Sequence, residues 1–202
     1  MPSHPSYLPA AERRAATVES VVALAADRNP SDITTTAIAK QMGLSQAALF
    51  KHFPTKDAIL VAVMEWVTEN LLARVDAEVR ATPVPLDALE ALFNAHVEFI
   101  IAHPGVPRLV FGELQRSRRS VPGRVVQALM QSYGERVAAI LARAKAQRAL
   151  AEGVDVEAAA MLFIGTIQGL VMQSLMRGDI GQLRQHAPRV FAIYRRGIER
   201  AR

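Results

Sequence analysis

The chain has 202 residues, half of them apolar, and is therefore long enough to bury the core of one or two domains. It contains no cysteine, which excludes a disulfide framework and a thiolate metal site and suits a reducing, cytoplasmic location. The net charge of +5 is compatible with nucleic-acid binding, but the most basic stretch, residues 116–124, is most simply interpreted as a solvated loop.

The first thirty residues predict an arm followed by a helix. No apolar run approaches the length of a membrane span, and residues 1–10 lack the apolar core of a secretion signal, so we expect a flexible arm and no membrane partner. In residues 11–28, apolar side chains from Val18 onward recur at i, i+3, i+4 and i+7, which predicts a helix. The sequence NPS at 29–31 is typical of a break between elements.

Two short helices separated by a glycine predict a helix-turn-helix. The first, TTTAIAKQMG, opens on threonines and closes at Gly43, and the second, LSQAALFKHF, can begin at Ser45 and is ended by Pro54. The motif needs a small residue at the helix contact, a glycine that accepts positive φ in the turn, and an apolar residue in the core. Ala39, Gly43 and Leu49 meet these needs at spacings of four and six. Helical hairpins without a DNA function can show the same spacing.

The second helix carries side chains that suit base recognition in the major groove. Its glutamine can bind adenine through two hydrogen bonds, and its alanine can contact a thymine methyl group. Threonines at the start of the first helix and cations after the second can bind phosphate. A lysine in the first turn of the next helix lies near the positive end of the helix dipole, which is unfavourable for a cation. A DNA phosphate bound by this lysine would make its position favourable. The predicted DNA contacts are Thr34, Thr36, Ser45, Gln46, Ala47, Phe50, Lys51, His52 and Lys56.

Residues 33–60, ITTTAIAKQMGLSQAALFKHFPTKDAIL, resemble the DNA-binding signature of the TetR family of bacterial transcriptional regulators. They depart from it at Phe50, where the family usually has a tyrosine whose hydroxyl often binds a phosphate. The resemblance implies a regulator, commonly a repressor, whose C-terminal bundle binds a small ligand and dimerises through its last two helices. The matching positions are Thr34, Ala39, Gly43, Ser45, Phe53 and Lys56.

The rest of the sequence is helical by period, and no segment alternates as a half-buried strand would, so we predict an all-α fold of about nine helices. A last helix carries Phe191, Tyr194 and Ile198. The helices before it are expected at about 56–80, 86–103, 107–117, 121–150 and 155–176.

We expect a DNA-binding domain over residues 1–55 and a ligand-binding and dimerisation domain over residues 56–202. The helix at 56–80 is continuous between them and is the element that could carry a change in the bundle to the recognition helix. The sequence HPGVPR at 103–108 favours a hinge beside it. A ligand wedged between this hinge and the helix would alter the spacing of two recognition helices, which must lie about 34–36 Å apart on DNA.

Residues 158–176 are apolar nearly all round, so the helix they form must be covered on every side. It could be central within a monomer, or one face could pack against a second copy where two glycines allow a close crossing. A dimer is also what a palindromic DNA site requires. The predicted dimer interface is Met161, Gly165, Gly169, Met172, Phe191, Tyr194 and Ile198.

Aromatic and apolar side chains in the second domain could line a cavity for a hydrophobic or aromatic effector. Each of them could equally belong to the core. The candidates are Trp66, Phe93, His96, Ile100, Phe111, Met130, Tyr133, Phe163 and Gln168.

The sequence offers little chemistry for catalysis. His96 and His103 lie two helical turns apart, roughly 10 Å along a helix, which is too far to share one metal ion. No nucleophile–base pair or phosphate loop is evident, so we expect no enzyme activity, no metal and no cofactor. The alternatives to a repressor are an activator, a helical interaction protein without specific DNA binding, and a nonspecific DNA coater, which the nearly neutral first sixty residues argue against.

Overall fold

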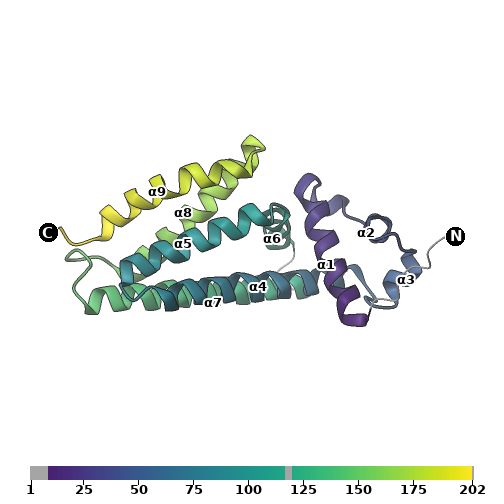
Figure 1. The fold of residues 1–202 in the computed structure, drawn as a ribbon, viewed down its shortest axis with the longest axis horizontal. Coiled ribbons are helices and arrows are strands. Elements are labelled where there is room, and N and C mark those ends of the chain that lie inside the picture. Colours follow the sequence, from purple (N-terminus) through teal and green to yellow (C-terminus); the bar gives the residue numbers. More distant parts are fainter. Residues whose placement is uncertain (1–8, 117–119, 202) are drawn as a thin grey trace. The chain divides into compact units, whose positions relative to one another are not determined.

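The computed structural model describes residues 9–116 and 120–201 (Figure 1). Over these ranges the chain forms nine α-helices and two 3-10 turns, with no strand beyond an isolated bridge between Leu150 and Glu199. The all-α prediction is confirmed. The chain divides into two compact units, Met1–Val67 with His103–Val126 and Thr68–Ala102 with Gln127–Arg202, which we call the N-terminal and C-terminal units.

The N-terminal unit contains the predicted helix-turn-helix together with a later helix of the chain. Its elements are α1 (Ala10–Asp27), η1 (Pro30–Asp32), α2 (Thr35–Gln41), α3 (Gln46–Phe50), the first part of α4 (Lys56–Ala81), α6 (Gly105–Gln115) and the start of α7 (Val121–Ala146).

Side-chain caps and one glycine set the ends of α2 and α3. The hydroxyls of Thr34 and Ser45 each accept a hydrogen bond from the backbone N–H three residues on, at 3.1 and 3.2 Å. Gly43 has a φ of +66°, a conformation that costs glycine little. The N–H of Leu44 then donates to the carbonyl of Ala39 at 2.8 Å, which closes the turn. The predicted caps and turn are confirmed.

The second helix of the motif is shorter than its period predicts. We expected helix over residues 44–53, whereas α3 spans Gln46–Phe50 and the chain turns before Phe53. Pro54 keeps the helix from continuing through Phe53, because a proline disfavours helical φ and ψ in the residue before it. Leu49 and Phe53 are nevertheless fully buried, as the motif requires.

The helix α6 packs directly on α1, which the sequence did not predict. A Cβ on Gly105 would lie 2.0 Å from the carbonyl oxygen of Val22, and one on Gly112 would lie 3.2 Å from the ring of Pro30. The two glycines stand two turns apart, so one face of α6 approaches both α1 and η1 closely. Residues 103 and 104 form the break between α5 and α6, and residues 105–108 begin α6, in whose first turn Pro107 is tolerated. The hinge at 103–108 stays a prediction.

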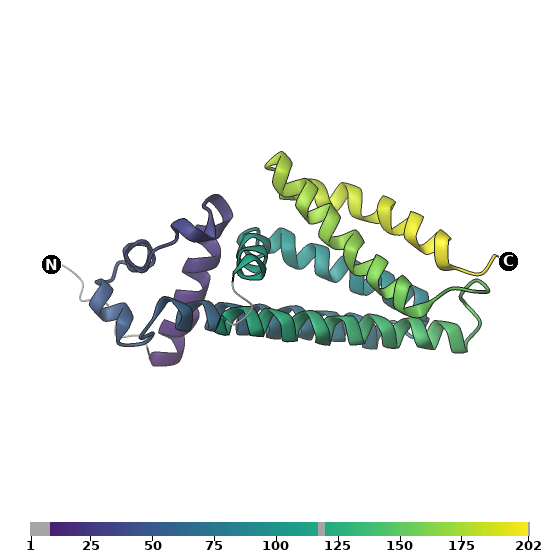
Figure 2. The same cartoon turned by 180° about the vertical axis from the view of Figure 1, so that it is seen from behind.

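The C-terminal unit is a bundle built around the later helices. Its elements are the remainder of α4, α5 (Pro85–Ala102), the remainder of α7, α8 (Val156–Arg177), η2 (Ile180–Gln182) and α9 (Leu183–Ile198). Figures 1 and 2 show α9 lying along α5 and α8. Edge-to-face and tilted ring contacts, with centroids 5.1–6.4 Å apart, form its aromatic core from Phe93, Phe163, Phe191 and Tyr194.

Arginine–carboxylate pairs join the helices of the bundle. Arg195 on α9 contacts Asp87 and Glu90 on α5 at 2.8 and 3.0 Å. Arg136 on α7 binds Asp76 on α4 at 2.7 Å. Each pair is partly exposed, so it fixes the register of two helices more than it adds stability.

Candidate nucleic-acid interface

The helix-turn-helix buries one face of α2 and α3 and exposes the other. Ile38, Ala39 and Leu49 are buried in the N-terminal unit. Phe50 is 40% exposed, although it is apolar. The predicted DNA contacts that are exposed are Thr34, Thr36, Ser45, Gln46, Ala47, Phe50 and Lys51. Lys40 and Gln41, at the end of α2, are exposed as well.

One predicted contact, Gln46, is held by a neighbour that the sequence analysis missed. Its Nε2 donates a hydrogen bond to Oγ1 of Thr35 at 2.8 Å. Thr35 is the first residue of α2 and Gln46 the first residue of α3, so the bond joins the two helices of the motif. Three consecutive threonines precede Ala37, and no sequence signal selects the middle one.

The residues after α3 are anchored to α1. His52 is half-buried, and its backbone carbonyl accepts a hydrogen bond from Arg14 at 3.5 Å. The guanidinium of Arg14 also lies over the ring of Phe53, 4.6 Å from its centroid. Arg14 is exposed, so it adds a positive charge close to Lys51 and His52 that we had not predicted.

Lys56 stands at the start of α4, as predicted, but it is already engaged within the protein. Its Nζ lies 3.5 Å from the carbonyl oxygen of Pro30 in η1. The next residue, Asp57, is bound by Arg116 at 3.0 Å. Arg116 also contacts the buried carboxylate of Glu113 at 3.1 Å. The basic stretch thus begins with a residue that packs on the protein, while its residues 117–119 lie outside the described part of the chain.

The apolar face predicted on α8 is turned away from its own bundle. Met161 and Met176 are 70% and 80% exposed, and Ile193 on α9 is 63% exposed. A Cβ on Gly165 or Gly169 would meet nothing within 4 Å in the protomer. Two shallow grooves of about 420 and 330 Å³ follow this face of α8 and α9.

Three of the predicted interface residues are largely buried within the protomer. Phe191 is part of the aromatic core, and the hydroxyl of Tyr194 donates to the carbonyl of Ala159 at 2.9 Å. Tyr194 and Ile198 nevertheless line the smaller groove on the exposed face of α8 and α9, so a role for these residues in a dimer stays a prediction. Both sides of α9 carry apolar residues, so its period alone does not tell which side is internal.

Length and composition also make α8 the one described helix that could cross a membrane. The core helix of a soluble protein passes the same test, so the absence of a membrane partner stays a prediction. About a third of its most apolar window is buried within the protomer.

The predicted ligand residues are divided between the two units. Trp66 and Phe111 belong to the N-terminal unit, where Trp66 packs edge-to-face on His103 at 4.9 Å. In the C-terminal unit, Phe93 and Phe163 are part of the aromatic core, and Gln168 is exposed on α8. Ile100 is buried and Met130 half-buried.

His96 and Tyr133 form a polar pair inside the C-terminal unit. The Nδ1 of His96 and the hydroxyl of Tyr133 are 2.8 Å apart, and they join α5 to α7. Burial lowers the pKa of His96 to about 4 and raises the pKa of Tyr133 well above its ordinary value. Both side chains are therefore neutral at pH 7.

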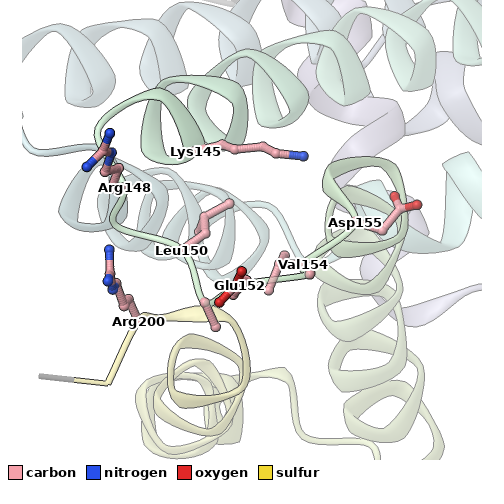
Figure 3. A pocket seen from close by; sticks show the side chains of 9 residues that line it. Lys145, Arg148, Leu150, Glu152, Val154, Asp155 and Arg200 are labelled. Atoms are coloured by element: carbon pink, nitrogen blue, oxygen red, sulfur yellow. The ribbon is translucent and has the colours of Figure 1, made fainter.

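A further surface pocket of about 630 Å³ lies between the end of α7 and the C-terminal segment of the chain (Figure 3). Lys145, Arg148 and Arg200 contribute positive charge to it, and Glu152 and Asp155 contribute negative charge. This mixed lining favours no single class of ligand. Over the described ranges, no group of three or more His, Asp or Glu side chains could hold a metal ion.

The chain matches two family models and is similar to individual proteins. Residues 19–63 match the family model for bacterial regulatory proteins of the tetR family, and residues 110–191 match the model for the tetracyclin repressor-like C-terminal domain. The nucleoid occlusion factor SlmA of Vibrio cholerae is 28% identical over 165 residues, which cover 79% of this chain and 81% of that protein.

Solved structures share the fold at lower identity. The ketosteroid transcriptional regulator KstR2 of Mycobacterium tuberculosis superimposes with a TM-score of 0.80 at 22% identity, over 94% of this chain and 96% of that one. FadR of Bacillus subtilis, in complex with stearoyl-CoA, gives a TM-score of 0.75 at 18% identity, over 92% and 99% of the two chains. At these identities the likeness shows the fold alone.

Proposed function

Because the chain belongs to the TetR family of DNA-binding bacterial regulators, we propose that it is a cytoplasmic repressor that binds a palindromic operator and is released by a small apolar or aromatic effector. The observation that carries the proposal is the solvent-facing side of α3, which combines base-reading and phosphate-binding groups. Gln46 and Ala47 stand at the N-terminal end of α3, where the recognition helix of this motif contacts base edges. Lys51 follows the last turn and is placed for phosphate.

A homodimer supplies the second recognition helix. The exposed apolar face of α8 and α9 supports this proposal, because a soluble protein rarely leaves such a face uncovered. Gly165 and Gly169 would let a second copy of α8 cross closely. Of the interface predicted from sequence, Met161, Gly165, Gly169 and Met172 lie on the exposed side of α8, and Tyr194 and Ile198 line the groove beside it.

The effector is expected to bind among the helices of the C-terminal unit. The core of this unit is apolar, and His96 and Tyr133 provide neutral hydrogen-bonding groups within it, which favours an uncharged or weakly polar ligand over an anion. FadR, which shares the fold, binds stearoyl-CoA, whose acyl chain is long and apolar. Only that chain is a precedent for the proposed effector, because the CoA group is anionic.

Three covalent connections could transmit effector binding to α3. The chain passes between the units within α4, between α5 and α6, and within α7. The close packing of α6 on α1 makes α6 a second route beside α4, which we had taken as the one element able to act. An effector can release DNA only if it binds the DNA-free form more tightly, and DNA must then weaken effector binding by the same factor.

A role in nucleoid occlusion is the second candidate, because SlmA of Vibrio cholerae is similar over most of this chain. A factor that marks the nucleoid needs many sites spread over the chromosome, whereas a repressor needs few sites close to promoters. Mapping the bound sites in cells separates the two. Many dispersed sites would favour nucleoid occlusion, and a few promoter sites would favour repression.

Selection of bound fragments from a random pool of duplexes tests the proposed function. We expect the recovered sequences to share a palindrome whose half-site centres lie about 10 base pairs, or a multiple of that, apart. The triple variant Gln46→Ala, Lys51→Ala, His52→Ala should recover no such sequence while remaining folded. If the fragments that the unmodified protein recovers share no consensus sequence, specific recognition would be contradicted.

A further inference from the structure

We propose that Thr35 is a specificity-determining residue that positions Gln46 for base recognition. This inference rests on the proposed function, because it concerns how the same interface reads its operator. Thr34 and Thr36 were candidates for phosphate contact, but Thr35 had no assigned role. The structure places its hydroxyl against the side chain that is best suited to read a base.

The contact restrains an otherwise exposed side chain. Gln46 projects from the first turn of α3, and its hydrogen bond to Thr35 Oγ1 is 2.8 Å long. Among the described residues this is the one hydrogen bond that the Gln46 amide forms. A long exposed side chain without such a partner samples many rotamers and must lose that freedom on binding.

The hydrogen bond leaves the groups that read adenine available. An amide nitrogen carries two N–H donors, and Thr35 accepts from one of them. The second N–H can donate to N7 of adenine while Oε1 accepts from its N6 amino group. Thr35 and adenine can therefore bind the same Gln46 side chain at the same time.

Thr35 also couples base reading to the docking of the motif. Its own O–H remains available as a donor, because Oγ1 uses a lone pair to accept from Gln46. Thr35 lies at the start of α2, where side chains of this motif meet the phosphate backbone. A DNA phosphate that accepts a hydrogen bond from this hydroxyl would hold the Thr35 side chain in place. Thr35 would in turn hold the Gln46 side chain over one base pair.

A double-mutant cycle tests the proposal, with the duplex recovered by the unmodified protein as the probe. Thr35→Val removes the hydroxyl and keeps the β-branched shape, whereas Thr35→Ser keeps the hydroxyl. Gln46→Ala removes the reader, and Thr82→Val is the matched control, because it makes the same hydroxyl-to-methyl change in the C-terminal unit, outside the predicted DNA contacts. Affinity is measured for the operator and for operators changed at each base pair in turn.

We expect Thr35→Val to lower the discrimination between operator and changed operator about tenfold at one base pair. This should be the same base pair at which Gln46→Ala loses discrimination. Thr35→Ser and Thr82→Val should leave the discrimination at that base pair within about twofold of the parent. In the Gln46→Ala background, Thr35→Val should change the discrimination at that base pair by less than about twofold, because Thr35 acts through Gln46.

Three results would overturn the proposal. Thr35→Val could leave every base preference unchanged. It could also lower operator affinity by the same factor with and without Gln46, which would make Thr35 a simple phosphate contact. Gln46→Ala could alter no base preference at all. These results leave a consensus operator intact, whereas failure to recover any consensus would overturn the proposed function together with this inference.

Discussion

Individual residues in the N-terminal unit are constrained by backbone packing as much as by side chains. Gly105 is the clearest case, since a Cβ there would lie 2.0 Å from the Val22 carbonyl oxygen and 2.9 Å from the Ala26 nitrogen. Both of these atoms belong to the backbone of α1, so neither can move away without distorting that helix.

We therefore predict that Gly105→Ala destabilises the protein by about 3 kcal/mol, the upper part of the range for overpacking. Amide hydrogen exchange should show the loss of protection in α1 and α6, and urea unfolding should show the lower stability. Gly134→Ala in α7 is the control, because the nearest atom to its Cβ is 3.8 Å away. That variant should gain up to about 1 kcal/mol from helix propensity, and equal effects of both substitutions would refute the packing account.

His96 predicts a dependence of stability on pH. Its pKa of about 4 in the folded protein lies below the ordinary value of 6.5, because burial disfavours the charged ring. The unfolded chain therefore takes up a proton at this residue before the folded protein does. The stability it contributes is complete above pH 6.5 and is lost as the pH falls toward 4, by about 3 kcal/mol in total.

Urea unfolding of the parent and of His96→Asn at pH 7 and pH 4 measures this contribution. The asparagine can still accept the Tyr133 hydrogen bond but does not titrate. We expect the variant to lose about 3 kcal/mol less between the two pH values than the parent does. An identical loss in both proteins would mean that the histidine titrates normally.

At the scale of the element, helix ends depend on a few backbone conformations. Arg148 follows α7 with a φ of 56°, in the left-handed region that favours glycine, and the N–H of Ala149 then donates to the carbonyl of Ala144 at 2.9 Å. This cap ends α7 at Ala146, a few residues before the end at 150 that the period predicts. Gly178 ends α8 in the same conformation, with a φ of 72°.

Opposite effects are expected from exchanging residues at these two caps. Arg148→Gly should raise the free energy of unfolding by about 0.5–1 kcal/mol, because it removes the steric cost of a Cβ at positive φ. Gly178→Ala should lower it by about 1 kcal/mol for the same reason, since no atom would otherwise obstruct the new Cβ. Urea unfolding measures both, and a stabilising Gly178→Ala would contradict the argument.

Elements defined by local chemistry could be predicted from the sequence, whereas contacts between distant segments could not. Thr34, Ser45 and Gly43 act on groups only a few residues away, so their identity was sufficient. The contact of Gly105 with Val22 and the bond of Gln46 to Thr35 join separate helices, and no local pattern indicates either.

At the scale of the whole molecule, the account depends on a homodimer. The exposed apolar side chains of α8 and α9, among them Leu162 and Ile193, are available to a second copy. We predict that Leu162→Asp combined with Ile193→Asp converts a dimer to a monomer, because each would bury an unpaired charge. Light scattering should show the mass fall from two chains to one.

The matched control is Val84→Asp, which places the same charge on another exposed apolar residue of the C-terminal unit. It should leave the mass at two chains. A double variant that stays dimeric would mean that the interface lies elsewhere. A parent protein that is already monomeric would mean that there is no such interface.

The affinity ratio between the selected operator and a scrambled duplex of equal length and composition tests the central claim most directly. Measured at one physiological salt concentration, it separates base recognition from the attraction of any basic protein to phosphate. We expect the dimer to bind the operator at least about a thousandfold more tightly than the scrambled duplex. Equal affinity for the two duplexes would contradict sequence-specific recognition by α3.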